Sequence, residues 1–202
     1  MKPAKQQKRD RPKKVEESLS YSVEVRDKQG RVLQRISAPS RSYVQAWNQI
    51  LSVQARHVAT GGFKDTGGTL RPCDPDNNSL NCYAVASSVA LGIRVGKGTT
   101  AVAIDDYALE TPLGEGTGTD EFEHQVMTRT EPSVAGSTCS FTIKRIINNA
   151  SGATITGIKE IGTYVRFGLG YFALGFRDVL PNAVSVPDGG SITVTYTIAV
   201  TV

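Results

Sequence analysis

The alternation of apolar and polar residues near the start of the chain is typical of β-structure. Residues 21–26 alternate between Tyr or Val and polar side chains, and a second short run follows with Val32 and Ile36. Between the two runs lies Gly30, which can adopt the left-handed backbone of a hairpin loop. This pattern predicts a β-hairpin.

The spacing of apolar residues then becomes helical. Between Ser40 and about Val58 the apolar side chains recur at intervals of three and four residues. The spacing predicts a helix over about 40–58, with Ser40 as its N-cap and a Gly-Gly pair after its end. Trp47, the only tryptophan, lies in the middle of the apolar stripe, where packing in the core is expected.

The remainder of the chain has the pattern of a β-protein. Residues 60–82 are rich in Gly, Asp, Asn and Pro, which predicts a long loop with a short extended piece at 69–71. Beyond this loop we expect strands at 86–95, 100–104, 122–129, 139–147, 155–158, 171–179, 183–186 and 191–202.

The last strand has the clearest alternation. Every second residue from Ile192 to Val202 is apolar, and the residues between them are mostly Ser and Thr. Such a strand packs one face against a second sheet, and its threonine face is either solvated or an assembly surface. We therefore expect a mainly β protein, an antiparallel β-sandwich or jelly roll with one helix. It would form a single domain over 19–202, preceded by a basic N-terminal arm at 1–18.

Charge is distributed unevenly along the 202 residues. The net charge is +4, but residues 1–14 alone hold seven Lys or Arg and one Asp, so the remaining residues have a balance of −2. The arm has few apolar side chains, so we expect it to be extended or disordered, and to act as a solubilising tail or as an electrostatic contact with phosphate or an acidic protein. The arm residues expected to bind a partner are Lys2, Lys5, Lys8, Arg9, Arg11, Lys13 and Lys14.

A second charged segment is acidic. Residues 105–123 contain no Lys or Arg, and their acidic residues are Asp105, Asp106, Glu110, Glu115, Asp120, Glu121 and Glu123. Paired carboxylates can bind calcium or hydrolyse glycosides, but EF-hand spacing is absent. A solvated loop and a contact with a basic partner, such as the arm of a neighbouring copy, are the other two interpretations.

The sequence does not contain a recognisable catalytic or cofactor-binding pattern. In the Gly-Lys-Gly-Thr-Thr segment at 96–100 a Gly separates Lys from Thr and a strand is expected to follow, so we interpret it as a hairpin turn rather than a phosphate loop. Of the two histidines, His57 is expected to flank the helix end, and His124 lies on the apolar register of its strand. We expect a protein that is not an enzyme and has no cofactor.

The cysteines do not predict a metal site. Cys73, Cys82 and Cys139 have no histidines at zinc-binding spacing, although Cys73 and Cys82 could be bridged if oxidised. The arm lacks the apolar segment of a secretory signal, and no stretch approaches the roughly 18 apolar residues of a membrane span. We therefore expect neither metal nor membrane.

Two segments carry a family resemblance. Residues 91–109 (LGIRVGKGTTAVAIDDYAL) and 174–202 (LGFRDVLPNAVSVPDGGSITVTYTIAVTV) resemble β-rich virion structural proteins of tailed bacteriophages. The resemblance extends over about 40–202 and implies a β-sandwich virion component at the head surface, neck or tail. The arm and the 73–82 segment are outside the shared pattern.

The expected function is that of a structural subunit of a phage particle, made in the host cytoplasm. Its partners would be other virion proteins and copies of itself, and its arm would bind a neighbouring subunit or, nonspecifically, packaged DNA. The alternatives are a jelly-roll coat protein whose arm neutralises the genome, and a carbohydrate-binding receptor module. For that module the aromatic platform would comprise Tyr83, Tyr107, Tyr164 or Tyr171.

Overall fold

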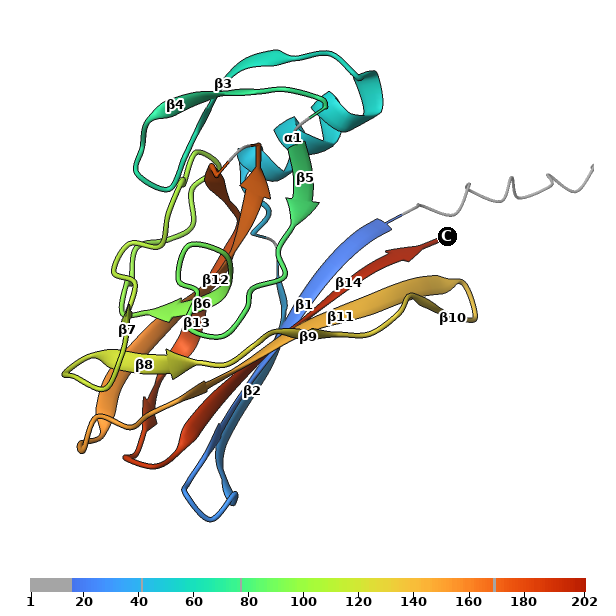
Figure 1. Cartoon of the computed structure of the whole chain (residues 1–202). Coiled ribbons are helices and arrows are strands. Elements are labelled where there is room, and N and C mark those ends of the chain that lie inside the picture. The colour runs from blue at the N-terminus through green and yellow to red at the C-terminus, as the bar shows by residue number, and fades with distance from the viewer. Residues whose placement is uncertain (1–15, 41, 77, 169) are drawn as a thin grey trace, which may run out of the picture.

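The structure is a computed structural model that describes residues 16–40, 42–76, 78–168 and 170–202. The seven basic arm residues, Lys2 to Lys14, lie outside the described residues. Within the described part, strands in two large sheets and one small sheet are accompanied by a single helix (Figure 1). The prediction of a mainly β protein with one helix is therefore confirmed, whereas its assignment as a sandwich or jelly roll stays a prediction.

The largest sheet has eight strands in the order β2-β1-β14-β11-β8-β7, with β9 and β10 also paired to β11. Its strands are β1 (Glu16–Arg26), β2 (Val32–Ser40), β7 (Gly114–Glu115), β8 (Glu121–His124), β9 (Thr128–Arg129), β10 (Ser133–Ala135), β11 (Thr138–Asn148) and β14 (Ser191–Thr201). Strands β1, β14 and β11 are long and antiparallel, and they form the rigid centre of the sheet.

The second sheet has four strands and packs against the first. Its strands are β5 (Asn78–Asn81), β6 (Gly92–Gly96), β12 (Ile155–Phe167) and β13 (Phe172–Val186), and a separate hairpin contains β3 (Thr60–Lys64) and β4 (Leu70–Cys73). The rings of Phe176 on β13 and Tyr196 on β14 meet edge to face, with centroids 4.6 Å apart. This contact joins the two large sheets in one hydrophobic core.

The predicted hairpin and the predicted last strand are both confirmed. Strands β1 and β2 pair around Gly30, whose φ of 80° is the left-handed conformation that the turn requires. On β14, Ile192, Val194 and Tyr196 are fully buried, as the alternation indicates.

The helix is shorter than predicted. Helix α1 (Gln45–Arg56) begins after Val44, whose side chain cannot cap it. Ser40, the predicted N-cap, is instead the last residue of β2, and its Oγ lies 2.5 Å from Oγ of Ser42. The helix ends at His57, whose φ of 50° reverses the chain before the Gly-Gly pair. His57 therefore flanks the helix end as predicted. Trp47 is buried against Phe176, with ring centroids 5.6 Å apart, so its core position is also confirmed.

Several strand boundaries differ from the predictions. The predicted long loop at 60–82 contains β3, β4 and β5, and the predicted strand at 86–95 is reduced to β6. The predicted strand at 100–104 is irregular, because carboxylates take the backbone N–H groups there: Thr100 N donates to Glu110 at 2.9 Å, and Ala103 N donates to Asp106 at 3.0 Å. The strand at 122–129 is divided into β8 and β9, whereas β13 is continuous over the two predicted segments.

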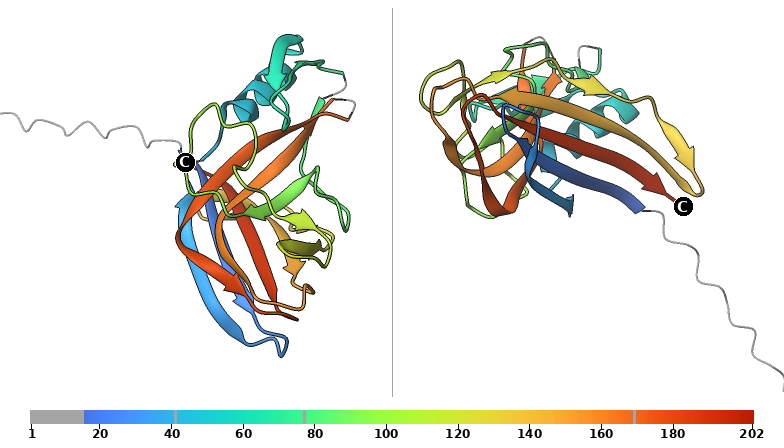
Figure 2. Two further views of the ribbon diagram at one scale, coloured as in Figure 1. Left: turned by 90° about the vertical axis from the view of Figure 1, so that its left-hand side faces the viewer. Right: turned by 90° about the horizontal axis from the view of Figure 1, so that it is seen from below.

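One end of the large sheet extends beyond the rest of the molecule. We call this part the blade: residues 16–20 of β1, 197–201 of β14, 138–142 of β11, and β10. The blade projects away from α1 and the second sheet, and it ends beside the C-terminus (Figures 1 and 2). In the described part of the chain, the one helix has only 12 residues and is not long and apolar enough to cross a bilayer.

Candidate protein-binding groove

The blade has an apolar inner face. Residues that are paired across an antiparallel sheet share one face, so the pairs Phe141–Ile198 and Cys139–Val200 lie on the same face as the buried Tyr196. Val134 of β10 is paired with Cys139 and continues this face toward the edge of the sheet. Three strands, β10, β11 and β14, therefore place a continuous set of apolar side chains on a part of the sheet that the second sheet does not cover.

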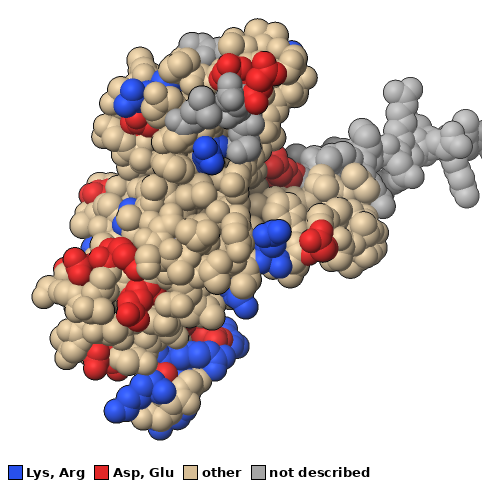
Figure 3. All heavy atoms as spheres, viewed as in Figure 1, with Lys and Arg blue, Asp and Glu red and all other residues tan. Residues whose placement is uncertain are grey.

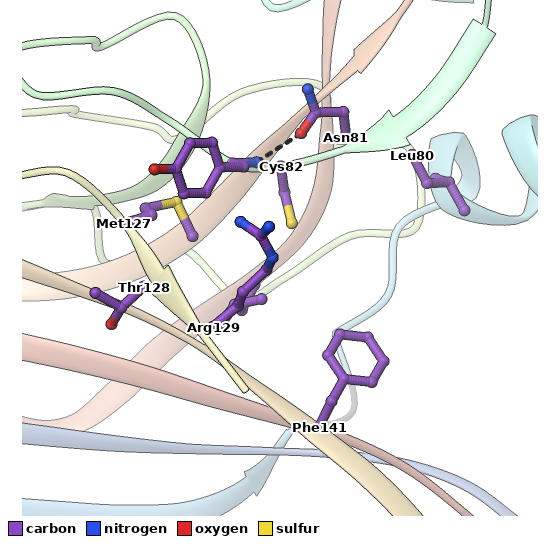
Figure 4. Close-up of a pocket in the computed structure, with 9 residues that line it drawn as sticks. Leu80, Asn81, Cys82, Met127, Thr128, Arg129 and Phe141 are labelled. Carbon is purple, nitrogen blue, oxygen red and sulfur yellow. Dashed lines mark hydrogen bonds between the residues drawn. The ribbon is translucent and has the colours of Figure 1, made fainter. Parts of the chain in front are cut away.

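The apolar face borders two hollows that share Phe141. The outer hollow has a volume of about 560 Å³ and is lined by Glu17, Pro132, Cys139, Phe141, Ile198, Ala199 and Val200. The inner hollow has a volume of about 530 Å³ and is lined by Leu80, Asn81, Cys82, Tyr83, Met127, Thr128, Arg129, Phe141 and Ile143. We call the two hollows together the blade groove. In Figure 4, Phe141 points from β11 toward the segment that contains Leu80 and Cys82.

Exposure along the groove increases toward the blade tip. On β14, Tyr196 has no exposed surface, Ile198 is partly buried, and Val200 is 44% exposed. Val134 is 75% exposed. Each Å² of apolar surface left in water costs about 25 cal/mol relative to burial, and a contiguous apolar patch on a soluble protein typically marks a binding surface.

The inner hollow has one aromatic and cationic wall. The guanidinium of Arg129 lies 5.0 Å from the ring centroid of Tyr83, and Tyr83 N donates to Oδ1 of Asn81 at 2.9 Å (Figure 4). Burial raises the pKa of the Cys82 thiol to about 11, so this sulfur is protonated at neutral pH and unreactive. The groove offers contact surface and a few hydrogen-bonding groups, but it does not place a base beside a nucleophile.

Figure 3 shows Asp and Glu side chains over β7 and β8, where part of the predicted acidic segment lies. The segment is bound mainly by the protein itself. Arg177 of β13 is buried, and its guanidinium contacts Glu160 at 2.9 Å, Asp106 at 2.9 Å and Glu110 at 3.4 Å. Backbone donors at Thr100 and Thr99, together with the Thr100 hydroxyl and Arg177, hold the pKa of Glu110 below its usual value. These ion pairs fix the loop to the second sheet.

The more distal carboxylates of the segment also have internal partners. Glu115 contacts Nδ1 of His124 at 2.6 Å, Asp120 contacts Nζ of Lys97 at 2.5 Å, and Glu121 accepts a hydrogen bond from Gly118 N at 2.9 Å. Asp105 and Glu123 are the members of the predicted set for which the described residues provide no side-chain ion pair or hydrogen bond. The role of this segment as a contact loop stays a prediction, and it now depends mainly on these two residues.

The Gly-Lys-Gly segment is occupied by carboxylates as well. Glu160 accepts hydrogen bonds from the backbone N–H groups of Gly98, Glu110 and Thr111 at 3.0, 3.0 and 2.7 Å. A Cβ at Gly98 would lie 2.5 Å from Cβ of Glu110, so only glycine fits there. These donors are bonded within the protein, where a phosphate loop would present them to a ligand.

His124, Arg145 and Arg94 form a buried cluster. His124 is 1% exposed and Arg145 is fully buried. The Arg145 guanidinium donates to the carbonyl oxygens of Gln125 at 2.8 Å, Ile93 at 3.0 Å and Val85 at 3.1 Å. Burial and the nearby Arg145 lower the pKa of His124 to about 4, although Glu115 opposes the shift. The ring is therefore neutral at pH 7. Its burial confirms the core position that its register in the strand predicts, although Nε2 has no hydrogen-bond partner among the described residues.

Of the four tyrosines proposed for a carbohydrate platform, one is buried and the other three contact side chains of this protein. Tyr164 is 4% exposed and its hydroxyl accepts a hydrogen bond from Leu109 N at 3.1 Å, so its predicted exposure was wrong. Tyr107 lies beside Lys64, Tyr171 packs on Phe167 and Arg71, and Tyr83 lines the groove. Cys82 and Cys139 are free thiols, so the structure has no Cys73–Cys82 disulfide. Among the described residues, no group of three His, Cys, Asp or Glu side chains is arranged to hold a metal ion.

The groove was not identified by the sequence interpretation. The signal was the apolar alternation of β14, which continues to Val202 and has counterparts in Cys139 and Phe141 on β11. Recognising it as a surface feature required knowing where the second sheet ends. No protein-family model, curated protein or solved structure matches this chain.

Proposed function

We propose that this chain is a structural subunit of a tailed-phage particle and acts by binding copies of itself and other virion proteins. The observation that supports the proposal is the blade groove, an apolar surface formed by long and rigid strands and left uncovered by the rest of the fold. The phage assignment is supported by the resemblance of residues 91–109 and 174–202 to virion proteins. The head surface, the neck and the tail are the candidate positions.

The polar interior supports a structural role. The buried ionisable side chains Arg145, Glu160 and Arg177 form ion pairs or hydrogen bonds that hold loops to the sheets. Buried charges that are fully engaged in this way stabilise one arrangement of the chain and are poorly placed to act on a substrate. We therefore propose a protein that is not an enzyme.

The test is deletion of residues 1–14 during infection. We expect the truncated chain to remain folded and soluble, because the described core begins at β1, but to be lost from purified particles. A second variant that replaces the seven basic residues with Gln keeps the length of the arm and separates charge from reach. Particle content is measured by quantitative mass spectrometry. Normal incorporation of both variants, or absence of the wild-type chain from particles, would refute the proposal.

A coat protein is the second candidate, and the charge of +6 over residues 1–14 is the observation in its favour. Such an arm neutralises nucleic acid with a steep dependence on salt concentration. Purified full-length protein that assembles alone into closed shells around nucleic acid would favour this candidate over a minor subunit. A copy number per particle far below that of the major shell protein would exclude it.

A further inference from the structure

The blade groove has carboxylates where a partner would contact it. Glu17 lies on the inner face of β1, is exposed, and lines the outer hollow. Burial and, second, the charge of the Glu17 carboxylate raise the pKa of Tyr43. Glu17 therefore lies close to the aromatic cluster of Tyr43 and Phe176. Glu131, also exposed, directly precedes Pro132, another lining residue. The outer hollow is therefore mostly apolar, with the carboxylate of Glu17 in its lining and Glu131 next to a lining residue in the sequence.

This charge distribution selects among possible occupants. Two blades packed face to face around a two-fold axis would bring the two Glu17 side chains into one interface, and like charges there oppose association. A basic segment has the opposite effect, because Lys and Arg stems lie along apolar surface while their charges reach carboxylates. Residues 1–14 are the most strongly basic segment of the chain, with a balance of +6.

The acidic segment at 105–123 is a less suitable binding site for the arm. Asp106, Glu110 and Glu115 already have cationic or histidine partners within the protein. An arm that bound there would have to compete with the buried Arg177, whereas Glu17 forms no salt bridge among the described residues.

The direction of β1 favours an arm from a different copy. Glu16 pairs with Thr201, so the chain joins the blade at its free end, beside the C-terminus. To lie along the outer hollow of its own copy, the chain would have to reverse direction directly before Glu16. Fifteen extended residues span up to about 50 Å, which is enough to reach the groove of an adjacent subunit.

We infer that the outer hollow of the blade groove binds the basic N-terminal arm, residues 1–15, of a neighbouring copy of the same chain. The inference rests on the proposed function and specifies one of its contacts. Lys and Arg stems of the arm lie against Phe141, Ile198 and Val200, and their charges meet Glu17 and Glu131. Repetition of this head-to-tail contact links successive subunits in a ring or an open array.

The experiment uses Cys139, which lines the groove, as an acceptor for cross-linking. The donor chain is full length, with Gln7→Cys to place a thiol in the arm and Cys139→Ser to remove its own acceptor. The acceptor chain is full length, isotopically labelled and otherwise native. After mixing with a short bis-maleimide, we expect a peptide pair that joins residue 7 of the unlabelled copy to Cys139 of the labelled copy.

Charge reversal in the acceptor then tests the contact itself. Glu17→Lys should reduce the cross-link yield by about threefold or more, since reversal changes an attraction between exposed charges into a repulsion. Asp105→Lys is the matched control, because it makes the same charge change at an exposed position of the acidic segment and should leave the yield unchanged. Val200→Ser is a second groove variant, and Trp47 fluorescence confirms that each variant is folded.

The outcomes separate this inference from the proposed function. A cross-link within one copy, a cross-link that Asp105→Lys weakens and Glu17→Lys does not, or self-association by light scattering without the 7–139 pair would each overturn the inference. The subunit proposal would survive any of these results, since it is judged by the content of the particles. A cross-link between copies that follows Glu17 and Val200 supports the inference.

Discussion

Acidification should destabilise this protein through protonation of the buried His124. The pKa of the buried ring is about 4, against about 6.5 for an unfolded histidine. Below pH 6.5 the unfolded chain therefore binds a proton that the folded chain does not bind until about pH 4. The contribution of neutral His124 to stability is fully present above pH 6.5 and is lost as the pH falls toward 4.

The magnitude follows from linkage. One pKa unit corresponds to about 1.4 kcal/mol, and integrating between pH 7.5 and pH 5.0 gives a loss of about 2 kcal/mol in the free energy of unfolding. Extending the range below pH 4 raises the total to about 3 kcal/mol. The higher range is preferable for measurement, because the lowered pKa of Glu115 places its own titration below 4.5.

The assay is urea unfolding followed by the fluorescence of Trp47, the single and buried tryptophan. Stability is compared at pH 7.5 and 5.0 for the wild-type chain, His124→Asn and His57→Asn. Asn at position 124 can replace Nδ1 as the donor to Glu115, and Asn at 57 tolerates the left-handed backbone.

Only the pH-dependent difference is used, so a general loss of stability in His124→Asn does not affect the result. The wild-type chain and His57→Asn should each lose about 2 kcal/mol, and His124→Asn should lose much less. An equal loss in all three proteins would show that another group is responsible, and would refute this account of the cluster.

The remaining predictions concern packing and the buried charges. Gly92→Ala should destabilise the fold by about 2 kcal/mol or more, because its φ is 82° and the new Cβ would lie 2.4 Å from Sδ of Met127. Gly152→Ala is the control: its φ is 80°, but no atom lies within 4 Å of the new Cβ, so it should cost only about 1 kcal/mol. Thermal unfolding measures both changes. Glu160→Gln should cost about 1.5–3 kcal/mol, because Arg177 loses its buried carboxylate partner but keeps Asp106 and Glu110. Glu160→Gln combined with Arg177→Met should cost less than the sum of the single changes. Additive losses in the double variant would exclude coupling between the two residues.

The sequence was most informative where local pattern and tertiary environment agree. The alternation of β14 predicted both its extent and its buried face, because the second sheet covers Ile192, Val194 and Tyr196 in that register. The helix was located correctly but predicted to begin too early, because the apolar spacing already starts in the connection between Ser40, where β2 ends, and Gln45, where α1 begins. Here the competing strand pairing of Ser40 with Leu19 determines the boundary.

Predictions failed where distant side chains replaced backbone partners. Residues 100–104 have the composition of a strand, but Glu110 and Asp106 accept the N–H groups that a neighbouring strand would have bonded. Similarly, Asp106 and Glu110 of the acidic segment turn toward Arg177, which lies more than 60 residues away in the chain. A sequence pattern cannot show that pairing, because it depends on how the second sheet approaches the loop.

The apolar alternation of the large sheet extends farther than the core that it builds. A strand that packed only against the second sheet would need apolar side chains on this face as far as Tyr196, yet the pattern continues through Ile198 and Val200. Phe141 and Cys139 extend β11 in the same way, so the excess belongs to the sheet as a whole. Surface of this kind is normally covered in the working state of a protein, because exposed apolar area favours association. A segment from outside the described fold, such as the proposed arm of a neighbouring copy, would bury this surface and remove that cost.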